Sequence, residues 1–418
     1  MHLQHLIVLL ISAILASAEW GFYVNHDTVA LPQTREPRKL IVCVDGTSQT
    51  PGSVSDIQSM GHIKVTAAMT PSNVVKLAYL TAQHHKEGAE QNQKVYYHSG
   101  PGTEVSDSTE ASLEDMYGNI KGHVMDAYAW LAKEYQEGDE IYAFGFSRGA
   151  TIVRSLFSLI REAGLPIATE ESAPTPDPSW AFTTATTSTK SVHLPVAPPV
   201  DPSKLHPKVN LKFIGVFDTV EALDVPEGFW LTKIQEEIGV IEPNDYHDLT
   251  IGNQVQYAYH ALSMDEKRSY FPPTLFEAPP ADLPAGFVRE QKWFRGDHAD
   301  IGGGWWEQGL ANIALNWMIE KARLAGLEVQ DQAVFEKAFS PFLLGASPEA
   351  LAARDDIKLH DYFATLPKED NSMMGRKVSR DLKAFKEKVH TLWCESSFHE
   401  SVEQLKDRIA PALNWIEL

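Results

Sequence analysis

Residues 140–163 read EIYAFGFSRGATIVRSLFSLIREA, and this stretch determines the fold that the sequence predicts. Its first part, EIYAFGF, is a short continuous apolar run of the kind that forms a strand buried on both faces. The motif Gly-Phe-Ser-Arg-Gly follows at 145–149, and the apolar residues after it recur at three- and four-residue spacing up to Gly164. A strand, a serine between two glycines and a helix in this order predict a sharp strand-to-helix turn with Ser147 at its apex.

The same alternation of strand and helix extends to both sides of this turn. Strands that alternate with helices require right-handed crossovers and a sheet that is covered on both faces. The predicted fold class is therefore α/β, with a doubly wound, mainly parallel sheet and helical C-terminal elements in 330–418. Strand patterns occur at 39–45, 94–98, 210–217 and, less clearly, 291–294, and helical periodicities occur at 120–135, 153–160 and 310–322.

The first residues predict a secretory signal peptide at 1–18, and thus a secreted, extracellular protein. Leu6 to Leu15 form an apolar stretch, and Ala16-Ser17-Ala18 places small residues at a cleavable spacing. The stretch is shorter than the roughly 20 apolar residues of a transmembrane helix. An uncleaved membrane anchor is the alternative, because the segment begins without the Lys or Arg that a signal peptide carries.

The rest of the chain is predicted to form one domain. After an irregular segment at 19–38, residues 39–418 show no linker or shift in composition that would divide them. Residues 166–208 interrupt the α/β pattern with a run rich in Pro, Thr, Ser and Ala that has neither a helical nor a strand period. We interpret this excursion as either a disordered insertion or a mobile flap over the active site.

The charge of the chain limits the classes of partner that it can bind. The 418 residues include 36 Lys and Arg against 56 Asp and Glu, a formal net charge of -20, and no basic tract that would neutralise phosphates. Nucleic acid is therefore not expected as a partner, and a lipid substrate would enter through a local apolar mouth during transient contact with a membrane surface.

Two cysteines, Cys43 and Cys394, cannot form a disulfide framework, and whether they pair with each other stays open.

A serine hydroxyl needs a base to remove its proton, and the turn motif predicts the chain order serine, acid, histidine. Asp218 ends the apolar pattern FIGVF, which places its carboxylate at the same edge of the sheet as Ser147. His298 lies in WFRGDHADIGGGWW, after a short strand and before a run of glycines. We predict Ser147 as the nucleophile, His298 as the base and Asp218 as the group that holds the histidine tautomer.

Two alternatives involve the carboxylates that flank His298. Asp297 and Asp300 together with His298 form a candidate divalent metal site of oxygens and one imidazole. Asp300 is also the second candidate for the acid of the triad. Two other histidines, His123 in a helical stretch and His260 in the YAYHAL run, are expected to be packed or at the surface.

The same motifs predict groups that would bind the oxyanion and the substrate. The backbone N–H of Arg148, at the start of the helix, is one expected oxyanion donor, and Gly46 or Thr47 after the first strand would supply a second. Trp305 and Trp306 follow the glycines and form either an apolar lip for acyl chains or part of the core. This chemistry requires no metal ion and no organic cofactor.

Eight segments of the chain, in order, resemble a known family: LIVCVDGTSQT, TPSNVVKLAYL, YYHSGPGTE, DEIYAFGFSRGA, GVFDTVEAL, YAYHALSMDEKRSYFPPTLF, WFRGDHADIGGG and SFHESVEQL. They span most of the chain from Lys39 onward and are similar to the α/β-hydrolase group whose bacterial members include phospholipase effectors of type VI secretion. The resemblance implies an α/β-hydrolase fold, a triad at Ser147, Asp218 and His298, and phospholipase activity in at least some relatives. The predicted signal peptide departs from the effector role, and the excursion at 166–208 stands where a structured cap would be expected.

The residues and the resemblance together predict a serine hydrolase that cleaves carboxylic esters through an acyl-enzyme, with lipid or phospholipid acyl esters as its substrates. One alternative is a carboxylesterase for small molecules. The other is a secreted binding protein that keeps the hydrolase scaffold without its chemistry, because a fold alone does not determine a function.

Overall fold

The computed structural model describes residues 36–47, 70–82, 92–101, 120–168, 182–185, 192–195, 202–220, 249–268, 271–277, 283–339, 352–360 and 396–405. By its internal contacts the chain divides into Met1–Glu36 and Pro37–Leu418, and the fold given below is that of the second unit. The predicted signal peptide at 1–18 and most of the irregular segment at 19–38 lie outside the described residues.

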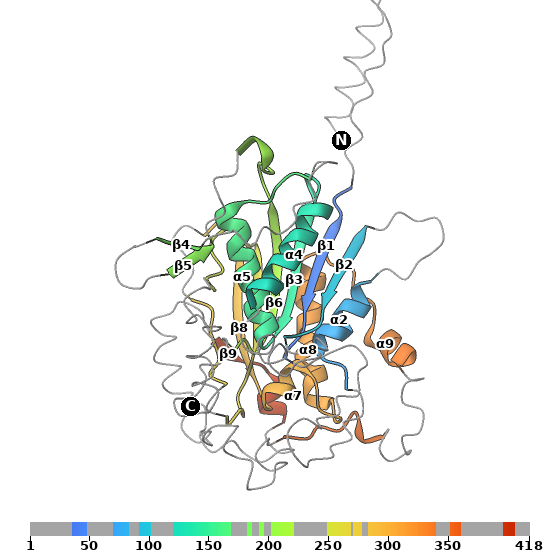
Figure 1. Cartoon of the computed structure of the whole chain (residues 1–418). Coiled ribbons are helices and arrows are strands. Elements are labelled where there is room, and N and C mark those ends of the chain that lie inside the picture. The colour runs from blue at the N-terminus through green and yellow to red at the C-terminus, as the bar shows by residue number, and fades with distance from the viewer. Residues whose placement is uncertain are drawn as a thin grey trace, which may run out of the picture. The chain divides into compact units, whose positions relative to one another are not determined.

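Seven parallel strands form one sheet, in the spatial order β2 (Gln93–His98), β1 (Lys39–Val44), β3 (Glu140–Phe146), β6 (Asn210–Phe217), β7 (Tyr257–Ser263), β8 (Val288–Phe294) and β9 (Ser396–Phe398) (Figure 1). β1 pairs with β2 on one side and with β3 on the other. The order in which strands are added therefore reverses direction between β1 and β3. In open α/β sheets, ligands bind at the carboxyl ends of the strands beside such a reversal. Ser147 follows β3 at this point.

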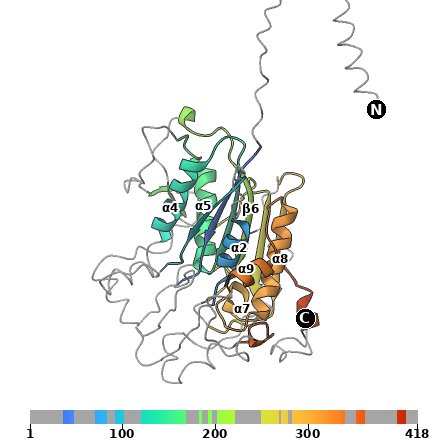
Figure 2. The ribbon, with the colours of Figure 1, turned by 90° about the vertical axis from the view of Figure 1, so that its right-hand side faces the viewer.

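Helices cover both faces of the sheet (Figure 2): α4 (Ile120–Glu134) and α5 (Arg148–Ala163) lie on one face, and α2 (Asn73–Thr81), α8 (Gly309–Leu324) and α9 (Gln332–Phe339) lie on the other. Successive side chains of a strand point to opposite faces. Leu40 of β1 accordingly packs in the core with α4 and α5, whereas its neighbour Ile41 packs in the core with α2 and α8. The structure confirms the predicted doubly wound α/β fold.

The strands predicted at 39–45, 94–98, 140–146 and 210–217 form as β1, β2, β3 and β6, and 291–294 is the end of β8. The sequence pattern does not predict β7, whose YAYHALS lacks a continuous aliphatic run and has a histidine in its middle. His260 is nevertheless fully buried, because its Nε2 accepts a hydrogen bond from Thr219 N–H (3.1 Å) and its Nδ1 lies 3.1 Å from Oε1 of Gln291. His260 is thus a packed residue.

The excursion at 166–208 contains more regular structure than predicted. Within its described part, β4 (Phe182–Ala185) pairs antiparallel with β5 (Val192–Pro195), and η1 (Pro202–Lys204) is a short 3-10 helix. The prediction of no strand structure is therefore wrong for these two segments, in which β-branched threonine and valine favour a strand. The ends of the excursion also lie side by side, because Ile167 N–H donates to Lys204 O (2.8 Å) and His206 N–H donates to Leu165 O (2.9 Å). A role as a flap stays a prediction.

The C-terminal part is described in pieces, which include α9, β9 and α13 (Ser401–Gln404). Within the region 330–418, which is predicted to be helical, residues 340–351, 361–395 and 406–418 lie outside the described residues, and Cys394 is among them. Cys43 in β1 is a free, fully buried thiol, and burial raises its pKa. None of the helices in the described part of the chain is both long enough and apolar enough to cross a membrane.

A buried guanidinium joins α5 to the segments that run toward β7 and β8. Arg154 is 1% exposed, and its nitrogens donate to the carbonyl oxygens of Leu249 (2.7 Å), Thr274 (2.7 Å) and Leu275 (3.1 Å). The guanidinium also lies 5.2 Å from the ring centroid of Phe276. These bonds hold the chain just after Phe271, a residue that contacts the candidate site, against the helix that begins at Ser147.

We expect Arg154→Met to lower the free energy of unfolding by about 3 kcal/mol or more, because it leaves buried carbonyl groups without a donor. Chemical denaturation of the variant measures this loss. Arg323→Met is the matched control: the Arg323 side chain is 43% exposed, and its loss should cost at most about 1 kcal/mol. Equal stability of the two variants would contradict the role given to Arg154.

Candidate active site

Ser147 lies at the sharp turn between β3 and α5. Its backbone φ of 57° and ψ of -124° fall in a region that residues with side chains rarely adopt, so the surrounding structure must hold it there. Ser147 N–H donates to Phe217 O (3.0 Å), which attaches the turn to the end of β6. A Cβ at Gly145 would lie 2.5 Å from Gly149 O, and a Cβ at Gly149 would overlap carbonyl oxygens at the end of β1. Both glycines are therefore needed for the turn to close.

Asp218 and His298, which are 80 residues apart in the sequence, meet directly beside this turn. Asp218 follows β6 with a φ of 38°, and its side chain is fully buried. Its Oδ1 accepts a hydrogen bond from Ser263 N–H (2.9 Å), and its Oδ2 accepts one from Nδ1 of His298 (2.6 Å). A carboxylate on Nδ1 selects the tautomer in which Nε2 carries a lone pair.

Two aromatic rings enclose the imidazole of His298, the first residue of α7 (His298–Gly302). The ring centroid of Phe146 lies 4.6 Å from that of His298, and the ring centroid of Phe271 lies 5.1 Å away. Burial lowers the pKa of His298 below its ordinary value, although the hydrogen bond and the charge of Asp218 oppose this change. This direction favours the neutral imidazole, the state in which Nε2 accepts a proton.

No hydrogen bond joins Ser147 to His298 in this structure. Phe146, which contacts the His298 ring, is the residue before Ser147. Nε2 of His298 is buried and has no hydrogen-bond partner among the described residues, and the Ser147 hydroxyl makes no capping bond at the start of α5. The structure thus forms the Asp218–His298 contact and leaves Nε2 available beside the serine turn.

The expected oxyanion groups come from two neighbouring turns. Arg148 begins α5, and its side-chain Nε donates to Oγ1 of Thr47 (2.5 Å), which connects the helix start to the turn after β1. Gly46 N–H already donates to Oδ1 of Asp45 (2.8 Å). Thr47 is therefore a better candidate than Gly46 for the second N–H donor, and the oxyanion role of these backbone groups stays a prediction.

The carboxylates next to His298 shape the start of α7. Asp297 and Asp300 form a capping box, in which each side chain accepts a hydrogen bond from the backbone N–H of the other. Burial raises the pKa of both carboxyl groups. Oδ1 of Asp300 lies 2.6 Å from Nδ1 of His360, so the alternative with Asp300 as the partner of His298 is wrong. The three side chains of the alternative metal site each contact a different residue: His298 contacts Asp218, Asp297 contacts Trp305, and Asp300 contacts His360.

The catalytic-domain model of the Tle1-like phospholipase effectors of type VI secretion matches residues 38–321, more than half of the chain. The chain belongs to this family. The match confirms the family resemblance of the sequence motifs, and the candidate residues Ser147, Asp218 and His298 all lie within it.

Individual relatives are distant. A curated but uncharacterized protein of Saccharomyces cerevisiae is 24% identical over 260 residues, which cover 58% of this chain, and the chain spans only 33% of that relative. A crystal structure of an uncharacterized protein from Pseudomonas aeruginosa has 14% identity and a TM-score of 0.39, with 78% of this chain and 50% of that chain covered. The structure of the Tle1 effector bound to the VgrG spike has 17% identity and a TM-score of 0.35, with 65% and 52% covered.

Two residues of the SMDEKRSYF segment without a predicted role, Glu266 and Arg268, lie near His298. Oε2 of Glu266 accepts a hydrogen bond from His298 N–H (3.2 Å) and pairs with Nη2 of Arg268 (2.8 Å). The Arg268 guanidinium lies 3.6 Å from the ring centroid of Phe271, which in turn contacts the ring of His298. The pair therefore positions His298 from two sides. The charged run at 265–268, just after β7, is the sequence signal that could have indicated the pair.

The two tryptophans after the glycines are half-buried. Nε1 of Trp305 donates to Oδ1 of Asp297 (2.9 Å), and its ring stacks on His360 with centroids 4.6 Å apart. The guanidinium of Arg354 lies 5.5 Å from the ring centroid of Trp306. Trp305 is thus part of the polar network behind α7, and a role of either tryptophan in binding acyl chains stays a prediction.

We expect Trp305→Phe to lower the free energy of unfolding by about 1–2 kcal/mol, because phenylalanine keeps a ring against His360 but removes a donor from the buried Asp297 carboxylate. Chemical denaturation measures the change. Unaltered stability together with weaker binding of long-chain esters would show instead that Trp305 serves as the acyl lip.

Proposed function

We propose that this protein is a serine hydrolase that cleaves the acyl ester bonds of phospholipids through a Ser147–His298–Asp218 triad. The observation that carries the proposal is the buried 2.6 Å contact between Asp218 and His298 beside a serine in a strained strand-to-helix turn. This combination supports acyl transfer, because it supplies a neutral imidazole of defined tautomer next to a hydroxyl at the start of a helix.

In the proposed reaction, Nε2 of His298 takes the proton of the Ser147 hydroxyl as Oγ attacks the ester carbonyl. The backbone N–H groups of Arg148 and Thr47 stabilise the negative charge that develops on the carbonyl oxygen. The imidazolium then gives its proton to the departing alcohol, and the acyl group remains on Ser147. Water, activated by the same imidazole, releases the fatty acid and restores the serine.

The contact between Oγ of Ser147 and Nε2 of His298 is the one step that the proposal adds to the observed geometry. Catalytic hydrogen bonds in unliganded enzymes are commonly long and shorten when the substrate binds. Nε2 has no hydrogen-bond partner among the described residues, which supports this step, since a base with another partner on Nε2 would first have to release it.

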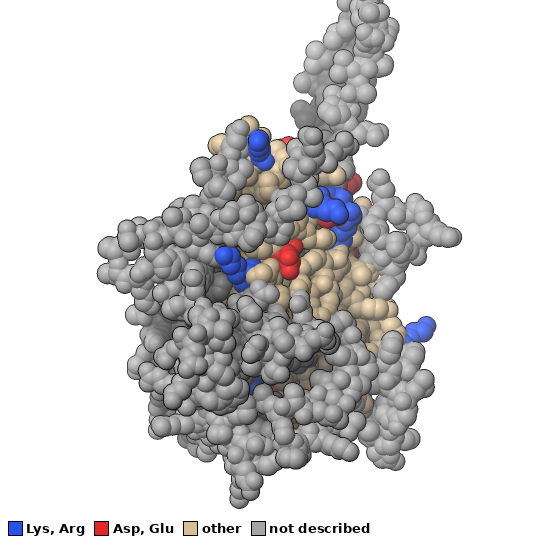
Figure 3. Space-filling view, in the orientation of Figure 1, with Lys and Arg blue, Asp and Glu red and all other residues tan. Residues whose placement is uncertain are grey.

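The family match supports a phospholipid substrate. The family is that of phospholipase effectors, and its catalytic-domain model covers all three residues of the proposed triad. On the face drawn in Figure 3, Lys, Arg, Asp and Glu side chains of the described residues are scattered among other residues instead of forming a basic band. We therefore propose that the substrate is recognised at a local mouth near Ser147 and not by general attraction to an anionic membrane. We further propose secretion through the signal peptide at 1–18.

Replacing Ser147 with Ala is expected to lower kcat on phospholipid vesicles by about a million-fold and to abolish covalent labelling by a fluorophosphonate. Ser155→Ala is the matched control on the same helix, since Ser155 is also buried but its hydroxyl has no hydrogen-bond partner among the described residues. Full esterase activity of the Ser147 variant would disprove the nucleophile. Labelling without phospholipid cleavage, but with cleavage of short-chain esters, would identify a small-molecule carboxylesterase.

The pH dependence of kcat/KM is expected to show an acid limb with its midpoint below pH 6.5, the ordinary pKa of histidine. Burial lowers the pKa of His298, so its neutral, basic form persists to lower pH and activity is lost only as the pH falls through that value. Asp218→Asn should move the limb further toward acid, because it removes a group that raises the pKa, and should lower kcat by roughly 10⁴-fold. A limb that stays in place in this variant would contradict the Asp218–His298 assignment.

A further inference from the structure

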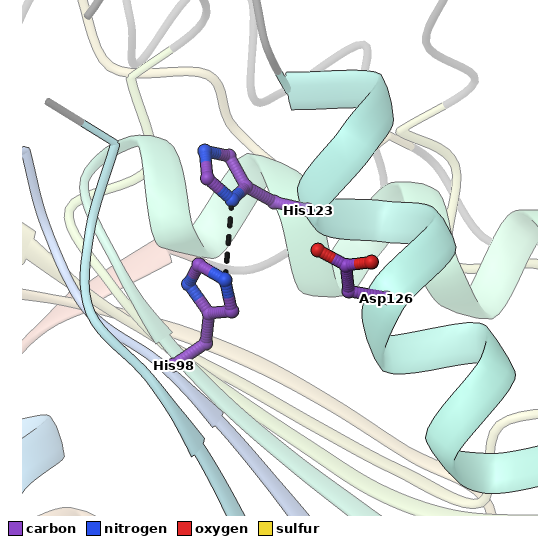
Figure 4. A group of neighbouring side chains, drawn as sticks. All are labelled: His98, His123 and Asp126. Carbon is purple, nitrogen blue, oxygen red and sulfur yellow. Dashed lines mark hydrogen bonds between the residues drawn. The ribbon is translucent and has the colours of Figure 1, made fainter. Parts of the chain in front are cut away.

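A second group of polar side chains lies at the edge of the sheet, outside the triad (Figure 4). His98 is the last residue of β2, His123 lies in the first turn of α4, and Asp126 follows one turn later. One possible ligand atom from each of these three side chains lies within 4.8 Å of the other two. We propose that His98, His123 and Asp126 bind a divalent transition-metal ion, with zinc as the best match.

The separation of the two imidazoles fits zinc. Nε2 of His98 lies 3.3 Å from Nδ1 of His123, and the two rings meet at an angle of 69°. Zinc–nitrogen bonds of about 2.0–2.1 Å in tetrahedral geometry place two ligand nitrogens about 3.3 Å apart. The two nitrogens thus already stand at the distance that a shared zinc ion requires.

The hydrogen bonding of His98 supports its role as a ligand. Nδ1 of His98 lies 2.5 Å from the carbonyl oxygen of Ser99, and a carbonyl only accepts, so Nδ1 carries the proton. The lone pair of His98 is therefore on Nε2, the nitrogen that faces His123. Histidine ligands of metals generally donate their second N–H to a carbonyl or carboxylate in this way.

Asp126 completes the set. It lies three residues after His123 on α4, and residues at this spacing share one face of a helix. Its side chain is exposed, so the carboxylate is hydrated and gives an ion a path from solvent. Two imidazoles and one carboxylate favour zinc over Mg²⁺ or Ca²⁺, which prefer sites built of oxygen, and leave the fourth tetrahedral position to water.

A metal here would add a connection between two elements that already share apolar packing and the ion pair between Lys94 of β2 and Glu134 of α4 (2.7 Å). His98 lies on β2, where its carbonyl oxygen accepts a hydrogen bond from Asp45 N–H (3.1 Å), and His123 lies on the helix that covers this edge. The neighbouring Tyr97 donates its hydroxyl to Oδ2 of Asp45 (2.8 Å). Zinc would thus hold α4 against β2 next to the turn that contains Gly46 and Thr47, and the melting temperature would rise as the free zinc concentration exceeds the Kd.

The test uses the full-length protein after treatment with a chelator. Calorimetric titration with ZnCl₂ is expected to show one ion per chain, Co²⁺ is expected to give the visible absorption of a tetrahedral complex, and zinc is expected to raise the melting temperature. His98→Gln and His123→Gln should each weaken zinc binding at least 10–100-fold, the range found for the loss of even an outer partner of a metal ligand. Asp126→Asn should weaken it as well.

His206→Gln is the matched control, because His206 packs against Tyr135 and lies outside the cluster, so this variant should bind zinc like the parent protein. Melting in chelator reports folding of each variant, and the exposed Asp126 provides a test even if a histidine variant fails to fold. If the parent protein binds no zinc, or binds it as tightly without these side chains as with them, the site does not exist, and the two histidines simply share a hydrogen bond. Fluorophosphonate labelling of Ser147 is independent of either outcome.

Discussion

The close approach of α5 to the end of β1 is the constraint on which the candidate site depends. At Gly149 the helix backbone touches the carbonyl oxygens of Val44 and Asp45, and no side chain fits between them. This contact leaves the chain only a sharp path from β3 into α5, and Ser147 takes a backbone conformation that costs on the order of 1–3 kcal/mol. The packing of α5 against the sheet offsets that cost, so a strained serine persists at the apex of the turn.

Among the buried charged groups around His298, Asp218 contacts the imidazole ring directly. Asp218 contacts Nδ1 directly, whereas Glu266 holds the backbone N–H of His298. Glu266 is paired with Arg268, and Asp300 is paired with His360. Each of these other carboxylates therefore has a partner of its own. Burial lowers the pKa of the imidazole and Asp218 raises it, while the smaller effects of Arg268 and Glu266 oppose each other. These pairs can position α7 while the pKa of His298 stays below its ordinary value.

The parts of the molecule that the sequence predicts are those with a local signal. The apolar run of β3 and the spacing of α5 are both contained within the stretch that surrounds Ser147. Asp218 and His298 also carry a local signal, because each follows a strand. Glu266 and His360 carry none that assigns a partner, since their roles arise from contacts with residues 32 and 60 positions away that only the folded chain brings together. β7 is missed because its buried histidine is stabilised by such contacts and not by its own pattern.

The position of each histidine in the sheet accounts for the different chemistry proposed for it. Parallel strands bring all their carboxyl ends to the same end of the sheet, so residues that end or follow strands gather there. Ser147 and Asp218 follow adjacent central strands, where helices cover both faces, and the histidine that contacts Asp218 is buried, which lowers its pKa. His98 ends the outermost strand, β2, where it is half-buried and next to an exposed carboxylate. A position at a central strand therefore favours a buried histidine that can serve as a base. A position at the outermost strand favours imidazoles that a metal ion can reach from solvent.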